Sequence, residues 1–403
     1  MRRLGVFVVC ATLASTRARA DEPISLTVTG SAAPGFGSKV QEGDKPRDVP
    51  DAAALLEGQP GLRVRRLSGE GTFATLSIRG AASNQVGVVL AGVPLTGAAD
   101  PSLDWATLPL WPGASARVHR TFAPAALGGG YLGGIVEISP VEVSRSGDRT
   151  EVYDALSSFG AYRVRLADAR TIGSFQVATG LSYSRQEGDY RYFDPLLSSD
   201  VTRVNNRSAQ GAALLHARGE LDRWTLLFTG LASLRQDGVA GRFDYPLRGT
   251  KLDRDRELVS FEARRTDDAG RLLGRLWLRR DGRLFTAPMR EYTLVAGSAR
   301  TDVLGIGGAI GRSLRLDDLT LDGRVEPTFE ASGGTTLEGG DAPDHRRGAV
   351  GLALDATLRT GPRWSWIAAL RADARTDTGA ESARQEVLPV AHLGVEWRAL
   401  DFL

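Results

Sequence analysis

Hydrophobic and polar residues alternate through most of the chain after Thr150. In one such segment the odd positions are mostly apolar and the even positions are small or polar; the odd residues are Phe175, Val177, Thr179, Leu181 and Tyr183. The same period recurs at residues 224–228, 272–279, 350–359, 364–370 and 393–398. A period of two is typical of β-strands, whose successive side chains point to opposite faces. The pattern predicts about twelve strands between residues 150 and 403.

Two details favour a transmembrane β-barrel over a soluble β-sandwich or solenoid, which also alternate. The segments are longer than the usual globular strand of about five or six residues. Aromatic residues gather near the segment ends, as they do at membrane interfaces; they are Tyr183, Trp224, Trp364, Trp366 and Trp397. Long polar connections are expected at 186–207, 236–255, 281–300 and 331–347, with short turns between them. Long loops outside and short periplasmic turns are typical of such barrels.

Residues 48–140 show a different pattern, in which a predicted helix is followed by short apolar segments and many glycines. Asp51 is a suitable N-cap for a helix of good helix formers, and Gly58 and Pro60-Gly61 end it. The apolar runs after it are too short for more than a small α+β domain; they cover 62–67, 74–78, 86–89, 93–95, 116–119 and 135–138. The predicted fold class is therefore mainly β, with an α+β domain ahead of antiparallel barrel strands.

Residues 1–20 read as an export signal peptide. Arg2 and Arg3 precede an apolar run of about ten residues, and Ala18-Arg19-Ala20 is a small-x-small cleavage site. Cys10 is the only cysteine, so the mature chain is expected to form no disulfide and no thiolate metal site. Loss of the four signal arginines leaves 46 basic against 48 acidic residues, and this balance gives no indication of nucleic-acid binding.

Residues 21–47 form a predicted flexible arm, rich in Gly, Pro, Ser and charge, with one alternating stretch. That stretch is Ile24, Ser25, Leu26, Thr27, Val28, Thr29 and Gly30. A β-prone segment on a tether is able to add a strand to the sheet edge of a partner. Taken by itself, the stretch is better explained as a leader that docks nowhere.

Four sequence motifs occur in order within residues 48–140. They are Val49 to Leu62, Ala74 to Gly80, Val88 to Leu95 and Gly128 to Ile138. Together they resemble the plug domain of TonB-dependent outer-membrane receptors, and smaller cobalamin and siderophore receptors are nearest. The residues that carry the plug motif are Arg79, Gly80, Gly92, Val93, Pro94, Gly133 and Gly134. The resemblance implies that Ile24 to Gly30 bind TonB, and that Arg79 and the plug strands hold the plug against the barrel.

The chain departs from the family pattern in three places. Ala91 replaces the usual acidic residue, and Arg120 to Pro124 replace the usual Arg-Gly-Pro. Plugged transporters have 22 strands, whereas about twelve are predicted here. Open sheet edges are excluded from hydrocarbon, because each unpaired backbone group costs several kcal/mol there. A C-terminally incomplete chain is therefore the expectation, with a genuine small barrel as the alternative.

The resemblance implies an outer-membrane receptor for TonB-energised uptake of a scarce ligand such as a ferric siderophore or cobalamin. Its expected partners are TonB, outer-membrane lipid and that small ligand, with no nucleic acid and no cofactor. No enzyme is expected, because no metal-ligand spacing of histidines and no Gly-x-Ser-x-Gly motif occurs. The alternative is a non-transporting β-barrel or surface protein that uses the plug-like domain as a binding module. The sequence does not identify the ligand.

Overall fold

A computed structural model gives the arrangement of two parts of the chain, a small domain and a large sheet. The structure describes residues 37–41, 49, 51–66, 72–97, 101–120, 123–129, 131–139, 141, 148–195, 197–242, 245–288, 291, 296–361, 363–379 and 383–397. The predicted signal peptide and the segment Ile24 to Gly30 lie outside these residues.

The small domain, called the plug below, covers residues 37–141. Its elements are β1 (Gly37–Gln41), α1 (Ala52–Leu56), β2 (Leu62–Arg66), β3 (Ala74–Ile78), η2 (Ser83–Gln85), β4 (Val86–Leu90), β5 (Val93–Pro94), η3 (Trp105–Thr107), β6 (Ser115–His119), η4 (Ala125–Leu127) and β7 (Gly134–Ser139). One sheet has the order β1-β6-β7-β4-β5, and β2 and β3 form a separate hairpin. Pairing is antiparallel except between β4 and β7.

Helix α1 forms where the sequence predicts it. The Asp51 side chain caps it and accepts a hydrogen bond from the Ala54 amide at 2.8 Å. Leu55 and Leu56 are fully buried, in a core that also encloses Trp105 and Trp111. An N-cap of this kind contributes about 1 kcal/mol, so most of the helix's stability comes from this apolar burial.

Strand β1 corrects one expectation. The arm was expected to be flexible as far as residue 47, but β1 is the edge strand of the plug sheet and pairs with β6. Val40 is 3% exposed and packs into the core, which accounts for the order of this short polar segment. The expected flexibility therefore does not hold for residues 37–41, and the rest of the predicted arm lies outside the described residues.

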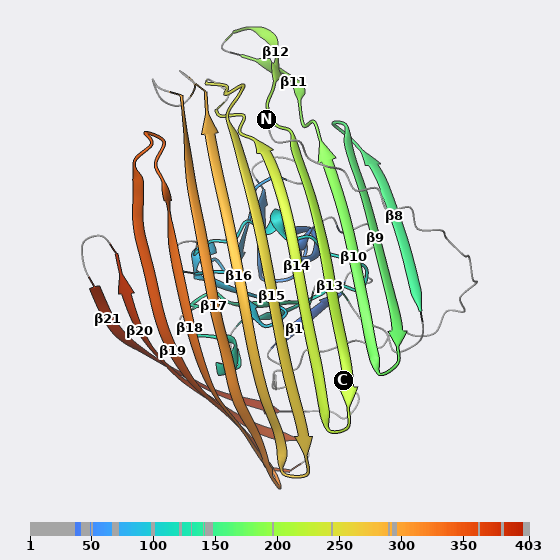
Figure 1. The fold of residues 1–403 in the computed structure, drawn as a ribbon, viewed down its shortest axis with the longest axis vertical. Helices are drawn as coiled ribbons and strands as arrows, with labels where there is room; N and C mark the ends of the chain where they lie inside the picture. Colours follow the sequence, from blue (N-terminus) through green and yellow to red (C-terminus); the bar gives the residue numbers. More distant parts are fainter. Residues whose placement is uncertain are drawn as a thin grey trace.

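The large sheet contains twelve antiparallel strands in nearly sequential order, as the alternation predicts. They are β8 (Arg149–Ser157), β9 (Ala161–Ile172), β10 (Phe175–Gln186), β13 (Ser208–Leu221), β14 (Trp224–Gly238), β15 (Lys251–Asp267), β16 (Gly270–Ala287), β17 (Gly297–Leu316), β18 (Leu319–Thr335), β19 (Asp341–Arg359), β20 (Trp364–Thr378) and β21 (Ala383–Trp397). The hairpin β11 (Tyr190–Asp194) and β12 (Ser199–Arg203) projects beyond the sheet between β10 and β13 (Figure 1). Figure 1 shows the tilted strands curving across the plug, which lies behind them.

The two faces of the large sheet have opposite character. On β15, Val259 and Phe261 are each 45% exposed on the outer face, whereas Ser260 and Glu262 are buried on the inner face toward the plug. Exposed apolar side chains and buried polar ones are the reverse of a soluble sheet. This arrangement is that of a transmembrane barrel strand, with its apolar face toward lipid and its polar face toward the lumen.

Aromatic side chains mark the end of the sheet that carries the short connections. The Trp364 and Trp397 rings stack with centroids 5.7 Å apart, and the Arg265 guanidinium lies over the Trp224 ring at 5.9 Å. These residues start or end their strands, as the sequence predicts for an interfacial girdle. No helix among the described residues has the length and apolar character needed to cross a membrane.

Strands extend further than expected at the opposite end. The predicted connection 331–347 is mostly strand, because β18 continues to Thr335 and β19 begins at Asp341. Likewise β15 begins at Lys251 and β16 ends at Ala287, inside predicted loops. Beyond the membrane both faces of a strand contact water, so pairing continues where the hydrophobic period has stopped.

The carboxylate of Glu291 links the connection between β16 and β17 to residues 248–250. Glu291, between β16 and β17, accepts hydrogen bonds from the Gly249 amide at 2.8 Å and the Thr250 amide at 2.9 Å, and from the Thr250 hydroxyl at 2.8 Å. The Arg248 amide donates a further bond at 2.9 Å. Burial raises the pKa of Glu291, but the hydrogen bonds from residues 248–250 outweigh it and hold the pKa below the ordinary value of 4.5.

We expect acid and the Glu291→Gln substitution to loosen this contact. Because the pKa is lower in the folded protein, the contribution of Glu291 to stability is complete above pH 4.5 and is lost as the pH falls through the folded value. Hydrogen exchange of the amides of residues 248–250 should therefore accelerate in Glu291→Gln at neutral pH, compared at equal pH with the parent chain. Glu338→Gln, in the exposed turn between β18 and β19, is the matched control. Equal protection of residues 248–250 in all three proteins would contradict the expectation.

Candidate functional site: the contact between plug and barrel

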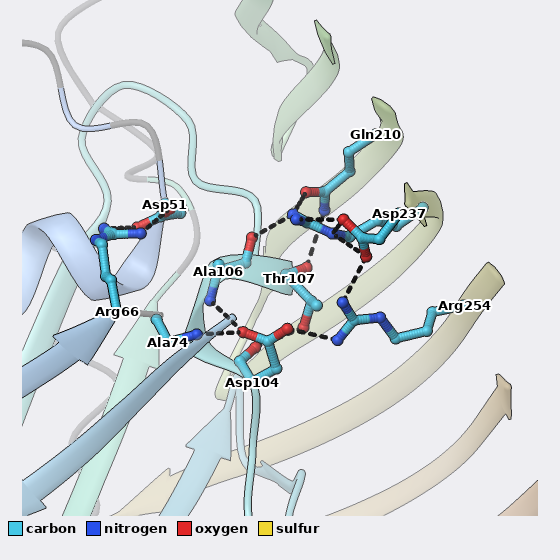
Figure 2. Close-up of polar contacts among 10 residues, drawn as sticks. Asp51, Arg66, Ala74, Asp104, Ala106, Thr107, Gln210, Asp237 and Arg254 are labelled. Atoms are coloured by element: carbon cyan, nitrogen blue, oxygen red, sulfur yellow. Dashed lines mark hydrogen bonds and ion pairs between the residues drawn. The ribbon is translucent and has the colours of Figure 1, made fainter. Parts of the chain in front are cut away.

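The plug presents the short helix η3 to the large sheet. Asp104 caps η3, and its Oδ1 accepts hydrogen bonds from the Ala106 amide at 3.1 Å and the Ala74 amide at 3.0 Å (Figure 2). Trp105 is buried behind it in the plug core. The Asp104 carboxylate is therefore fixed by the plug backbone, with Oδ2 directed at the large sheet.

Three strands of the large sheet bind this segment. Arg235 on β14 donates to the Ala106 carbonyl at 3.1 Å, and Gln210 on β13 donates to the Thr107 carbonyl at 2.9 Å. Arg254 on β15 forms an ion pair with Asp104. Figure 2 shows the Gln210 and Arg254 side chains reaching η3 from neighbouring strands. The contact combines one cross-domain ion pair with bonds to backbone carbonyls.

The arginines at this contact also have carboxylate partners on the large sheet itself. Asp237 on β14 pairs with Arg235 at 2.8 Å and also pairs with Arg254. Asp237 therefore keeps both guanidinium groups partly neutralised when the plug is elsewhere. This matters because removal of one partner from a buried ion pair costs about 3–5 kcal/mol when the other charge is left uncompensated.

The same arrangement recurs around the plug. Arginines on the inner face of the large sheet donate to plug carbonyls: Arg165 to Val49 at 3.2 Å, Arg275 to Gly92 at 3.1 Å, Arg279 to Pro94, and Arg371 to Ala125 at 2.7 Å. Three of them are also paired with glutamates of the sheet: Arg275 with Glu262, Arg279 with Glu330, and Arg371 with Glu326. Docking of the plug therefore depends on the plug backbone more than on plug side chains.

A second anchor holds η4. Asp355 on β19 accepts a hydrogen bond from the Ala125 amide at 2.9 Å, while the Ala125 carbonyl accepts the bond donated by Arg371. Ala125 also packs in a small apolar cluster with Ala353, Ile367 and Ala369 of the large sheet. These small side chains allow η4 to approach the sheet closely.

The plug sheet carries a half-buried carboxylate near the barrel arginines. Glu137 on β7 lies opposite Arg117 on β6. Burial raises the pKa of Glu137, although Arg117 and the barrel residues Arg275 and Arg264 oppose the shift. Inside the plug, burial would lower the pKa of Arg66, but its ion pairs with Asp51 (Figure 2) and with Glu57 raise it.

The structure places the residues of the predicted plug motif in two settings. Gly92 and Pro94 lie at the large sheet, where their carbonyls accept the bonds from Arg275 and Arg279; Val93 between them is fully buried. Arg79 and Gly80 lie in an exposed turn after β3, both with positive φ. The proposed role of Arg79 in holding the plug stays a prediction, as do the TonB contacts of Ile24 to Gly30.

Gly133 and Gly134 have a steric role at the start of β7. Gly134 has a φ of +120°, and a Cβ there would lie 2.2 Å from the His119 carbonyl oxygen. A Cβ on Gly133 would lie 2.8 Å from the Ala81 side chain. Only glycine fits at Gly134 without strain, because both the backbone conformation and the adjacent carbonyl exclude a side chain.

Sequence reasoning did not single out the residues of the large sheet that bind the plug, which include Arg165, Gln210, Arg235, Arg254, Arg275, Arg279, Asp355 and Arg371. The available signal was their position on the polar face of alternating segments, which the lumen side of a barrel requires. No group of three or more metal-ligating side chains occurs in the part of the chain that the structure describes.

Comparison with known proteins identifies the small domain and the overall fold. Residues 40–135 match the family described as the TonB-dependent receptor plug domain. The chain has the plug-and-barrel fold of a TonB-dependent receptor. Receptors with this fold are outer-membrane β-barrel proteins, and the apolar outer face of the large sheet agrees with that location. No curated protein sequence matches the chain.

Several solved structures share the fold at low sequence identity. The copper transporter OprC is 16% identical with a TM-score of 0.74, over 92% of this chain and 61% of that one. The FrpB iron transporter from Neisseria meningitidis is 11% identical with a TM-score of 0.73, over 90% and 62%. The ferric citrate transporter FecA, unliganded, is 15% identical with a TM-score of 0.68, over 91% and 61%. The chain thus spans about three fifths of the length of these proteins.

Proposed function

We propose that this receptor takes up a scarce metal chelate, such as a ferric siderophore, or cobalamin, with energy supplied through TonB. The observation that carries the proposal is a plug held inside a polar sheet by arginine-to-carbonyl bonds. Four of these arginines retain carboxylate partners on the large sheet when the plug leaves, so the cost of displacing it is limited; they are Arg235, Arg275, Arg279 and Arg371. The similar structures, named as copper, iron and ferric citrate transporters, support a small metal-containing ligand.

Ala91 does not weaken this proposal at the plug contact. Ala91 has a φ of 48° and lies in the turn between β4 and β5. The carbonyl of the next residue, Gly92, accepts the hydrogen bond from Arg275. The barrel thus binds the backbone of this turn, and the contact does not need an acidic side chain at position 91. In the proposed mechanism, TonB pairs with Ile24 to Gly30 as an added strand and pulls the plug partly out of the barrel.

Uptake in paired strains tests the proposal. Cells that lack other receptors and express this chain should accumulate one member of a panel of labelled siderophores, metal salts and cobalamin, and only when TonB is present. Ligand binding to isolated outer membranes should be the same with and without TonB. Accumulation that does not depend on TonB would refute the energising role of TonB. Binding without any uptake would favour the non-transporting surface protein instead.

A further inference from the structure

The inner face of the large sheet is apolar on one side of the plug, although the lumen face of a barrel is usually polar. One row of directly paired residues crosses the neighbouring strands β9, β10, β13, β14 and β15, and no member of the row has a polar side chain. The row, called the apolar seam below, consists of Ala167, Gly180, Leu214, Leu231 and Leu258. Its three leucines are between 1% and 4% exposed and belong to the same buried cluster as the plug core.

The plug meets the apolar seam with Trp111, which is fully buried. A Cβ built on Gly180 would lie 2.4 Å from Trp111 Nε1, so the indole fills the space that a side chain on β10 would need. The anchor of η3 lies on the same side of the plug, because Gln210, Arg235 and Arg254 project from β13, β14 and β15. Strands β9–β15 therefore hold the plug by an apolar contact and by the η3 anchor together.

The same row of paired residues changes character on β16–β19, further along the curved sheet (Figure 1). Leu258 on β15 pairs with Arg279 on β16, and the row continues through Gly305, Glu330 and Arg347. Arg279 and Glu330 form an ion pair at 2.9 Å across this side of the sheet. The row is thus apolar from β9 to β15 and mostly charged from β16 to β19.

Contacts between plug and barrel are less apolar on the charged side. Arg279 and Arg371 donate to plug carbonyls, and each keeps a glutamate partner on the large sheet. Hydrogen bonds of this kind are replaced by bonds to water at a small net cost. Opening the apolar seam instead exposes buried apolar surface, at a cost that rises with its area. The small cluster around Ala125 is the main apolar contact on the charged side.

We propose that the apolar seam stays closed when the plug moves, and that the passage for the ligand opens between the plug and the inner faces of β16–β20. The inference rests on the proposed function, and adds which wall of the barrel the ligand follows. This wall carries charges of both signs, from Arg279 and Glu330 on β16 and β18 to Arg371 and Asp373 on β20. Such a wall suits a hydrated, polar ligand, whereas the wall formed by β9–β15 stays covered by the plug.

Labelling of single cysteines in the purified full chain in detergent tests this inference. Ala178 on β10 belongs to the cluster that contains the apolar seam, and Ala353 on β19 packs against Ala125; they are 1% and 6% exposed. Cys10 is the only cysteine, so in a Cys10→Ser background each variant has one thiol. In urea that leaves the large sheet folded, Ala353→Cys should react with a sulfonated maleimide at least about tenfold faster than Ala178→Cys, each rate being divided by that of the unfolded variant.

A wedge at the apolar seam gives the matched comparison. Gly180→Val places a side chain where Trp111 lies, so Ala178→Cys should then react as fast as Ala353→Cys; Gly180→Ala is the milder wedge if the valine variant does not fold. Gly211→Val on β13, where nothing lies within 4 Å of a Cβ, should leave Ala178→Cys protected.

Three results would overturn the inference: equal reaction rates of Ala178→Cys and Ala353→Cys at every urea concentration below unfolding, faster reaction of Ala178→Cys, or protection of Ala178→Cys that no wedge at Gly180 removes. The labelling needs neither TonB nor uptake, so a failed uptake experiment leaves the measured difference between the two sides standing. A failed labelling experiment would remove the assigned passage and leave the proposed function intact.

Discussion

Deletion of Ile24 to Gly30 is expected to reduce uptake to the level of a strain without TonB, while ligand binding stays unchanged. Strand addition joins two proteins through several main-chain hydrogen bonds, each contributing about 0.5–1.5 kcal/mol. Loss of a total of about 3 kcal/mol or more lowers the affinity at least about 100-fold. In the proposed mechanism TonB acts from the periplasm and the ligand arrives from outside the cell, so ligand binding is not expected to depend on this segment. Uptake of labelled ligand and binding to isolated outer membranes measure the two effects separately.

A single substitution gives a sharper control than the deletion. Val28→Pro removes the amide donor needed for strand pairing, whereas Val28→Ile keeps the donor and the β-branched side chain. The proline variant should behave like the deletion, and the isoleucine variant should transport normally. Normal uptake by both the deletion and Val28→Pro would show that the energising contact lies elsewhere in the chain.

The sequence predicts the architecture well where one physical rule dominates. Alternation over 175–184 and 350–359 marks β10 and β19, because lipid on one side and a wet lumen on the other impose a strict period of two. Asp51 and the alanines after it predict α1 for equally local reasons. The rule fails beyond the membrane, where the strands β18 and β19 extend into a stretch expected to be a loop, and in the arm, where β1 is ordered by its partner β6.

The site is less predictable, because it is created by long-range pairing. Gly92 and Gly134 are recognisable from the glycine-containing motifs around them. Arg235 and Arg254, by contrast, are only two of many arginines on polar strand faces. Arg254 meets Asp104 across 150 positions of sequence, and nothing local to either residue indicates the partner. The acceptors make prediction harder still, since most of them are backbone carbonyls that leave no mark in the sequence.

Backbone acceptors also change what mutations of the plug should do. At Gly92, Pro94, Ala106 and Ala125 the barrel binds the carbonyl, so a side-chain change there leaves the acceptor in place. The backbone conformation sets the direction of these carbonyl groups, so the sequence must preserve that conformation. The glycines of the plug are therefore the positions where a small substitution has a large effect.

Gly134→Ala is expected to destabilise the plug strongly while the large sheet stays folded. The new Cβ would lie 2.2 Å from the His119 carbonyl oxygen, where β7 begins to pair with β6. Backbone strain and overpacking each cost about 1–3 kcal/mol, and both apply at this position. Residues 37–141 should become sensitive to protease at a much lower urea concentration than in the parent chain, with the strands of the large sheet still protected.

Gly80→Ala separates the two contributions. Gly80 has a φ of +83°, but nothing lies within 4 Å of a Cβ at this position, so alanine there adds backbone strain without a clash. Its effect should be about 1 kcal/mol, at the lower end of the range for strain alone. A large difference between the two variants would assign the sensitivity of Gly134 to the His119 carbonyl. Equal urea midpoints would contradict the steric explanation, and would mean that β7 moves away from β6 to accept the methyl group.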